Sequence, residues 1–150
     1  MELKIKALSP KIGTEIPLPK FATAGAACMD LCACLDEAVT LQAGERRLIP
    51  TGIAIALPSA DYVALVFARS GLGIKQGVCL SNGVGVIDSD YRGEICVGVI
   101  NQLAEPYTIA PDERIAQLVI MPVSLINPVE AQSLDDTARG EGGFGSTGKA

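Results

Sequence analysis

Two short apolar runs stand in the stretch Arg47-Leu-Ile-Pro-Thr-Gly-Ile-Ala-Ile-Ala-Leu-Pro-Ser-Ala-Asp-Tyr-Val-Ala-Leu-Val-Phe-Ala68. The first run alternates isoleucine and leucine with alanine over residues 53–57, which is the two-residue period of a strand with one better-filled face. The second run, residues 62–68, is rich in β-branched and aromatic residues. Proline and polar residues separate the two, as in a turn. The stretch therefore predicts two successive strands, over residues 47–57 and 62–68.

Similar runs follow one another along the rest of the chain, with glycine and proline residues between them. No stretch keeps the 3.6-residue period of a long helix, although Ser70 to Gln76 is compatible with one short helix or turn. Eight strands without intervening helices predict an all-β fold, a jelly-roll-like barrel or sandwich. The predicted strands are Leu3 to Ala7, Ala26 to Leu35, Arg47 to Leu57, Tyr62 to Ala68, Val78 to Leu80, Gly83 to Asp88, Glu94 to Asn101 and Arg114 to Val123.

The composition limits the classes of protein that are compatible with the chain. Its 150 residues are 49% hydrophobic, and no linker or internal repeat divides them, so a single β domain is expected. A net charge of −5 argues against binding to long nucleic acid, which needs a basic face; a small anionic ligand needs only a local cluster of arginines. The first six residues lack the apolar core of a signal peptide, and no apolar run has membrane-spanning length. We therefore expect a cytoplasmic protein with no membrane contact.

Cysteine and histidine usage bears on metal binding and catalysis. The chain has five cysteines and no histidine. Cys28, Cys32 and Cys34 raise a zinc hypothesis, but on a strand Cys28 and Cys32 share one face roughly 13 Å apart at about 3.3 Å per residue. Thiolates on one zinc lie about 4 Å apart, so structural cysteines are favoured. Without histidine, a catalytic base must be a carboxylate, lysine, tyrosine or cysteine, and a cation would be a hard one, most simply magnesium carried in with phosphates.

Two internal segments place polar residues within or after predicted strands. Asp30 stands among apolar residues and is compatible either with an ion pair to a buried arginine or with catalysis. Arg69-Ser-Gly71 follows the strand 62–68 and offers a guanidinium, a hydroxyl and an open backbone N–H to a phosphate. An ordinary turn has the same composition, so both interpretations stay open.

A third segment, Asn82-Gly-Val-Gly-Val-Ile-Asp88-Ser-Asp-Tyr91-Arg-Gly-Glu94, predicts a hairpin whose second strand continues to Asn101. Asp88 would stand at the end of the first strand, where apolar neighbours could adjust its pKa for a general base. The glycines leave backbone open to hydrogen-bond a flat base, and Tyr91 could pack against a sugar. A plain turn is the alternative.

The last twelve residues, Arg139-Gly-Glu-Gly-Gly-Phe-Gly-Ser-Thr-Gly-Lys-Ala150, contain five glycines and one aromatic residue. Such a segment cannot offset its ordering entropy by burying side chains, so it is predicted to be a flexible arm after a domain of residues 1–138. Its hydrogen-bond donors and the aromatic ring of Phe144 favour a lid that covers a bound nucleotide. A disordered tail is the alternative. Gly143 to Lys149 nearly matches the phosphate-binding loop pattern, but Ala150 stands at the Ser/Thr position, so that loop is not predicted.

Five motifs in order make the chain similar to the homotrimeric dUTPases, the deoxyuridine triphosphate nucleotidohydrolases. From about residue 22 onward they are Ala24-Gly-Ala-Ala-Cys-Met-Asp30-Leu, Arg69-Ser-Gly71, Asn82 to Glu94, Arg114-Ile-Ala-Gln117 and Arg139 to Gly148. The chain departs from the family pattern at two positions. Cys28 stands where the first motif usually has glycine, and Asp112 replaces the glycine common before the Glu-Arg of the fourth motif.

The resemblance implies a jelly-roll homotrimer that hydrolyses dUTP to dUMP and pyrophosphate, which limits uracil incorporation into DNA and supplies dUMP for thymidylate synthesis. It implies three active sites at subunit interfaces, with the arm of one chain closing over a neighbour's site. By the same resemblance, Asp88 activates the water that attacks the α-phosphorus, and Mg²⁺ arrives with the triphosphate. Asp30 would organise water around that metal without binding it directly.

The resemblance also implies how each part of the substrate is bound. The segment from Asn82 to Cys96 would read uracil, Tyr91 would exclude a 2′-hydroxyl, and Phe144 would stack on the base. The implied substrate-binding residues are Arg69, Ser70, Gly71, Asn82, Gly85, Val86, Ile87, Asp88, Tyr91, Cys96, Gln117, Arg139, Phe144, Gly145, Ser146 and Thr147. Two rivals are a dCTP deaminase of the same fold and a non-enzymatic nucleotide-sensing or protein-binding relative. The intact Asp-Ser-Asp-Tyr-Arg-Gly run and the glycine-rich tail disfavour the deaminase, and intact Asp88 and Phe144 disfavour a relative that has lost catalysis.

Overall fold

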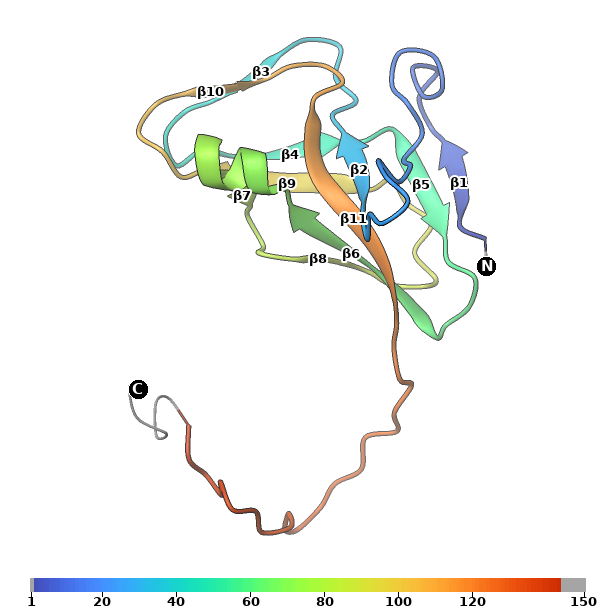
Figure 1. Ribbon diagram of the computed structural model, residues 1–150, viewed down its shortest axis with the longest axis vertical. Coiled ribbons are helices and arrows are strands. Elements are labelled where there is room, and N and C mark those ends of the chain that lie inside the picture. The colour runs from blue at the N-terminus through green and yellow to red at the C-terminus, as the bar shows by residue number, and fades with distance from the viewer. Residues whose placement is uncertain (1, 144–150) are drawn as a thin grey trace.

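The computed structural model describes residues 2–143 and shows an all-β protein with one short π-helical turn, η1 (Gly71–Lys75). In Figure 1 the strands β2, β11 and β6 cross β4 and β9 at a steep angle. The all-β prediction is confirmed, and the sheets form a sandwich-like arrangement rather than a closed barrel. The strands are β1 (Lys4–Ala7), β2 (Met29–Cys32), β3 (Val39–Leu41), β4 (Arg46–Pro50), β5 (Ile53–Ala56), β6 (Tyr62–Ala68), β7 (Val78–Leu80), β8 (Gly85–Ile87), β9 (Cys96–Asn101), β10 (Tyr107–Ile109) and β11 (Arg114–Pro122).

Two larger antiparallel sheets build the body of the molecule. One has the strand order β2-β11-β6-β8 and the other β4-β9-β7, while β1 pairs with β5 and β3 with β10. Aliphatic side chains from both larger sheets fill one core, including Leu31 and Leu118 from the first sheet and Ile49 and Val97 from the second. Aromatic residues make up only 4% of the chain, so branched aliphatic residues supply most of the buried surface.

The two runs that predicted the fold class form three strands rather than two. Residues 62–68 form β6 with the predicted bounds, but residues 47–57 divide into β4 and β5. The chain turns between them at Gly52, whose φ is +71°, and a Cβ at this position would lie 2.7 Å from the Sγ of Cys34. Backbone conformation and space therefore both require glycine. The short strands β3 and β10 were not predicted.

The predicted strand 26–35 is present only as β2. Its register with β11 shifts between Arg114 and Ala116, a bulge that leaves both Leu31 and Cys32 buried. Cys28 and Cys34 lie outside the strand, so the expectation that Cys28 and Cys32 share one strand face is wrong. All five cysteines are free thiols.

The predicted hairpin over residues 82–101 is wrong in its strand pairing. β8 pairs with β6 in the four-stranded sheet, whereas β9 pairs with β4 and β7 in the other. The segment between them therefore passes from one sheet to the other. Alternation along a strand specifies which face is buried, but not which strand lies beside it.

After β11 the chain leaves the body, and Figure 1 shows residues 123–143 extending away from the sheets. This segment contains no helix or strand, and residues 123–141 are exposed throughout. Among residues 2–143 there is no helix that combines the length and apolar character needed to cross a membrane.

Candidate functional site

A pocket of about 360 Å³ lies between β8 and the start of β9. This volume lies in the range of small-ligand sites. Seven residues assigned to the substrate from the sequence line it, namely Asn82, Gly85, Val86, Ile87, Asp88, Tyr91 and Cys96. The rest of the wall is mostly apolar and consists of Leu48, Val66, Leu80, Glu94, Ile95, Val97 and Gly98. The structure thus gathers one predicted cluster around a single cavity.

The backbone of β8 is the wall best suited to contact a flat ligand. β8 is the edge strand of its sheet and pairs on one side with β6. Its outer N–H and C=O groups are therefore oriented to hydrogen-bond a ligand edge-on, as an added strand would. Gly85 faces Val66, and a Cβ on Gly85 would lie 3.0 Å from the Cβ of Val66. Glycine therefore allows this close approach of β8 to β6.

The segment after β8 brings a carboxylate and an aromatic ring to the same pocket. Asp88 is exposed directly after the strand, and Tyr91 is 46% exposed. The Tyr91 hydroxyl donates a hydrogen bond to the main-chain oxygen of Glu94 at 3.0 Å. Cys96 follows at the start of β9, where burial and then the Glu94 carboxylate raise the pKa of its thiol. The pocket therefore combines an acidic group, a ring and a thiol that favours its neutral form.

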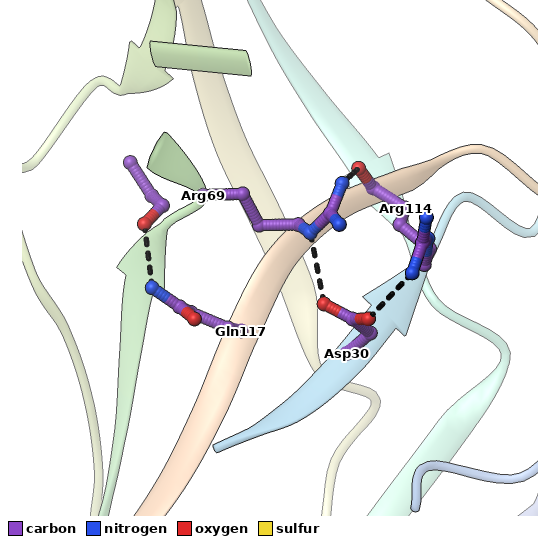
Figure 2. A network of polar contacts seen from close by, with 5 residues as sticks. Asp30, Arg69, Arg114 and Gln117 are labelled. Carbon is purple, nitrogen blue, oxygen red and sulfur yellow. Dashed lines mark hydrogen bonds and ion pairs between the residues drawn. The ribbon is translucent and has the colours of Figure 1, made fainter. Parts of the chain in front are cut away.

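A second cluster lies at the other end of β6 and joins two arginines to Asp30 (Figure 2). The Nε of Arg69 donates to one Asp30 oxygen at 2.8 Å, and the Nη1 of Arg114 donates to the other at 3.1 Å. The side chains of Asp30 and Arg69 are 26% and 27% exposed. The ion-pair interpretation of Asp30 therefore holds in the single chain. Gln117 donates its amide to the main-chain oxygen of Ala68 at 2.9 Å, beside the same strand end.

The predicted phosphate-binding residues lie together but apart from the pocket. Arg69 and Gly71 line a separate cavity with Arg114, and Ser70 is exposed at the start of η1. Ile87 faces Ala64 across the β6–β8 pair, so Asp88 lies near one end of β6 and Arg69 follows the other. Six residues of strand at about 3.3 Å each separate these positions by roughly 20 Å. One chain therefore carries two separate half-sites: the pocket beside β8 and the cluster of Arg69, Arg114 and Asp30.

The arm holds the remaining predicted residues. Arg139 is exposed and its Nε donates to the main-chain oxygen of Gly142 at 2.7 Å, within the arm itself. The other predicted arm residues, Phe144, Gly145, Ser146 and Thr147, lie outside the residues that the structure describes.

Sequence reasoning missed two polar members of these clusters. Arg114 opens a predicted strand within a recognised motif, so its position was a usable signal for the ion-pair cluster. Glu94 ends the third segment, and nothing local distinguishes it from a solvated carboxylate. The apolar wall residues Leu48 and Val66 come from different sheets, and only the tertiary structure shows that they meet.

The fold and the two half-sites define an all-β protein with a small-ligand pocket and a separate cationic cluster. A sequence model of the dUTPase family matches residues 14–148. The deoxyuridine 5'-triphosphate nucleotidohydrolase of Hahella chejuensis is 53% identical over 146 residues, which cover 97% of this chain and 96% of the relative. The chain belongs to the dUTPase family.

Solved structures agree with this membership. A point mutant of the Staphylococcus bacteriophage 80alpha dUTPase with dUpNHpp has a TM-score of 0.87 at 26% identity, over 99% of each chain. A mutant dUTPase from phage phi11 of S. aureus, which reveals the coordination of a structural Mg(II) ion, has a TM-score of 0.78 at 22% identity, over 91% of this chain and all of that one. At this lower identity the second likeness concerns the fold alone.

Proposed function

We propose that this protein hydrolyses dUTP to dUMP and pyrophosphate by attack of water on the α-phosphorus. The observation that carries the proposal is the pocket of about 360 Å³ in which Asn82, Asp88 and Tyr91 converge. Family membership supplies the substrate class, and the pocket supplies groups suited to a base, a sugar and an attacking water.

The uracil base is proposed to bind against the outer edge of β8. Uracil offers one N–H donor between two carbonyl acceptors, which matches alternating backbone groups of an edge strand together with the Asn82 amide. Cytosine has a different donor pattern and would leave polar groups unpaired, which strongly disfavours its binding. Tyr91 is proposed to pack on the deoxyribose and to exclude a 2′-hydroxyl.

Asp88 is proposed to orient and deprotonate the attacking water. It is the carboxylate at the end of β8 and lines the pocket, and the chain has no histidine to act as a base. Mg²⁺ accompanies the triphosphate as part of the substrate and offsets its charge, while Asp30 organises water around it. No covalent intermediate is needed, because water itself attacks phosphorus.

A homotrimer with active sites at its subunit interfaces is the arrangement proposed to unite the half-sites. Arg69, Ser70, Gly71 and Gln117 of one chain would hold phosphates of a nucleotide whose base lies in a neighbour's pocket. The separation of roughly 20 Å along β6 supports this sharing. The segment between β11 and the arm supports it further, since Leu125, Ile126 and Leu134 are 70%, 81% and 89% exposed in the single chain and would be buried against a second copy.

The arm is proposed to close over the neighbouring site, with Phe144 stacking on uracil. Arg139, Gly145, Ser146 and Thr147 would then contact the γ-phosphate. A cytoplasmic location belongs to the same proposal, and the five free thiols are compatible with a reducing compartment.

Product analysis tests the proposed reaction. The protein is incubated with Mg²⁺ and dUTP, dCTP, dTTP or UTP, and pyrophosphate, inorganic phosphate and ammonia are measured separately. We expect pyrophosphate from dUTP alone. Ammonia from dCTP would indicate a deaminase, and no product from any nucleotide would favour a binding protein.

Replacing Asp88 by asparagine tests the proposed base. The substitution keeps the volume but removes the proton acceptor, so turnover should fall by at least about a thousandfold while dUTP binding stays within a few fold of wild type. Single-turnover kinetics and equilibrium binding measure the two separately. A loss of binding as large as the loss of rate would contradict the assignment.

Mixed oligomers test the sharing of sites. Asp88→Asn and Arg69→Ala chains, each inactive alone, should regain activity when they are denatured and refolded together. The recovery follows because some interfaces then combine an intact Asp88 with an intact Arg69. If the mixture stays as inactive as its components, each site belongs to one chain.

A further inference from the structure

The loop of residues 88–94 is closed on itself by hydrogen bonds. The main-chain N–H of Tyr91 donates to the oxygen of Asp88 at 3.2 Å, and the Nη1 of Arg92 donates to the main-chain oxygen of Ser89 at 2.7 Å. The Tyr91 hydroxyl closes the far end by its bond to the Glu94 oxygen at 3.0 Å. Asp88 and Tyr91 therefore belong to one small unit whose placement depends on how its ends are attached.

The C-terminal end of this loop is attached to the corner between β4 and β5. The Oε1 of Glu94 accepts a hydrogen bond from the N–H of Gly52 at 2.8 Å. Next to it, the N–H of Ile95 donates to the oxygen of Ile53 at 2.9 Å, and the buried Thr51 hydroxyl donates to the oxygen of Ile95 at 2.6 Å. Glu94 thus provides a side-chain link between the loop and the β4–β5 corner, just beyond the end of the β4–β9 ladder.

The corner offers little freedom to adjust if this link is lost. Gly52 has a φ of +71°, and the Sγ of Cys34 occupies the space where a Cβ would stand. A backbone N–H at such a corner needs an acceptor, and a carboxylate gives a stronger hydrogen bond than a neutral group. Glu94 also lines the pocket, so a shift of its backbone moves the pocket wall and Tyr91 together.

We propose that Glu94 is a positioning residue: by accepting the Gly52 N–H it fixes the 88–94 loop and thereby sets the position of Tyr91 against the sugar of the nucleotide. The inference rests on the proposed function, in which Tyr91 excludes a 2′-hydroxyl. It adds that the selectivity against ribose depends on a side chain whose carboxylate is bonded to the corner between β4 and β5.

The experiment compares Glu94→Ala with Glu94→Gln in full-length protein. Alanine removes the acceptor, so the KM for dUTP should rise about tenfold and the preference for dUTP over UTP, as a ratio of kcat/KM values, should fall about tenfold. Glutamine keeps an acceptor oxygen at the same distance and should retain the wild-type KM and preference within about threefold. Glu37→Ala, an exposed carboxylate outside the pocket, is the matched control and should change neither quantity.

Glu94→Asp is a second variant that keeps the test valid if the alanine variant does not fold. It keeps the charge, but its carboxylate is one methylene too short to reach Gly52, so it should lose the same selectivity as alanine. The inference is overturned if Glu94→Asp or Glu94→Ala keeps the wild-type preference for dUTP, or if glutamine loses as much as alanine. Failure of the proposed function has a different signature, since the wild-type protein itself would then fail to prefer dUTP over UTP.

Discussion

Asp112 adopts a backbone conformation that usually belongs to glycine. Its φ of +62° is the only positive value of a non-glycine residue among residues 2–143. It follows Pro111 in a turn that is closed by a hydrogen bond from the N–H of Glu113 to the oxygen of Ala110 at 3.2 Å. Such a turn favours proline at its second position and glycine or asparagine at its third. The departure from the family's glycine is therefore tolerated with some strain rather than compensated by a different turn.

Replacing Asp112 by glycine should stabilise the protein by about 0.5 kcal/mol. The left-handed conformation costs a residue with a Cβ about 1–2 kcal/mol, less for aspartate, while glycine adds unfolded-state entropy worth about 0.4–1 kcal/mol. Urea unfolding at fixed protein concentration measures the change. Alanine at position 112 is the matched control and should lower the free energy of unfolding. The expected order of stability is glycine, then aspartate, then alanine, and any other order would contradict backbone strain at this position.

The same residue influences a buried thiol. Burial and then the charge of Asp112 raise the pKa of Cys32 to about 11, so roughly one thiol in a thousand is ionised at pH 8. Since only the thiolate reacts, Cys32 should be alkylated by iodoacetamide much more slowly than Cys28, with the difference shrinking as the pH rises toward 11. Peptide mass spectrometry after timed labelling checks this. Asp112→Asn removes the charge and should speed labelling of Cys32; equal rates for both cysteines in the native protein would contradict the prediction.

At the scale of elements, one buried amide joins the end of β9 to the β3–β10 pair. Asn101 is fully buried, and its Nδ2 donates to the oxygens of Leu41 and Glu105 at 3.1 and 2.8 Å. Its Oδ1 accepts from the N–H of Leu103 at 3.0 Å. This side chain therefore ties the end of β3 and the segment before β10 to the end of β9.

Asn101→Ala should therefore lower the free energy of unfolding by roughly 3 kcal/mol. The substitution removes three hydrogen bonds and leaves buried main-chain groups without partners. Thermal and urea unfolding measure the loss. Thr108→Val, which removes only the exposed hydroxyl pair with Thr40, is the control and should cost less than about 0.5 kcal/mol. Similar losses for both variants would show that Asn101 does not tie these elements together.

At the scale of the whole molecule, the strands and the exposed C-terminal segment occupy different parts of the chain. Every strand of the described chain lies between residues 4 and 122, whereas residues 123–141 are exposed. Exposed apolar residues between β11 and the arm, such as Ile126 and Leu134, are the ones proposed above to pack on another chain. The glycine-rich end carries the groups proposed to touch the nucleotide.

Deletion of residues 139–150 should leave a folded oligomer with little dUTP hydrolysis. Circular dichroism and sedimentation report the fold and the assembly, and pyrophosphate release reports the activity. Deletion of residues 123–150 is the comparison, and it should also weaken the oligomer because it removes the apolar segment. Full activity of the shorter deletion would show that the arm is not a lid.

The amino-acid sequence was enough to predict the all-β class, most strand positions and the family, because hydrophobic alternation and ordered motifs are local properties of the chain. It also places Asn82, Asp88 and Tyr91 within the single segment whose residues line one pocket. It could not determine the division of residues 47–57 at Gly52, where space beside Cys34 decides the conformation, or the true partners of β8 and β9. Only the tertiary structure placed Arg69 and Asp88 at opposite ends of β6 and linked Glu94 to Gly52. These relations join residues far apart in the chain, and strand pairing and register, rather than local pattern, decide which of them meet.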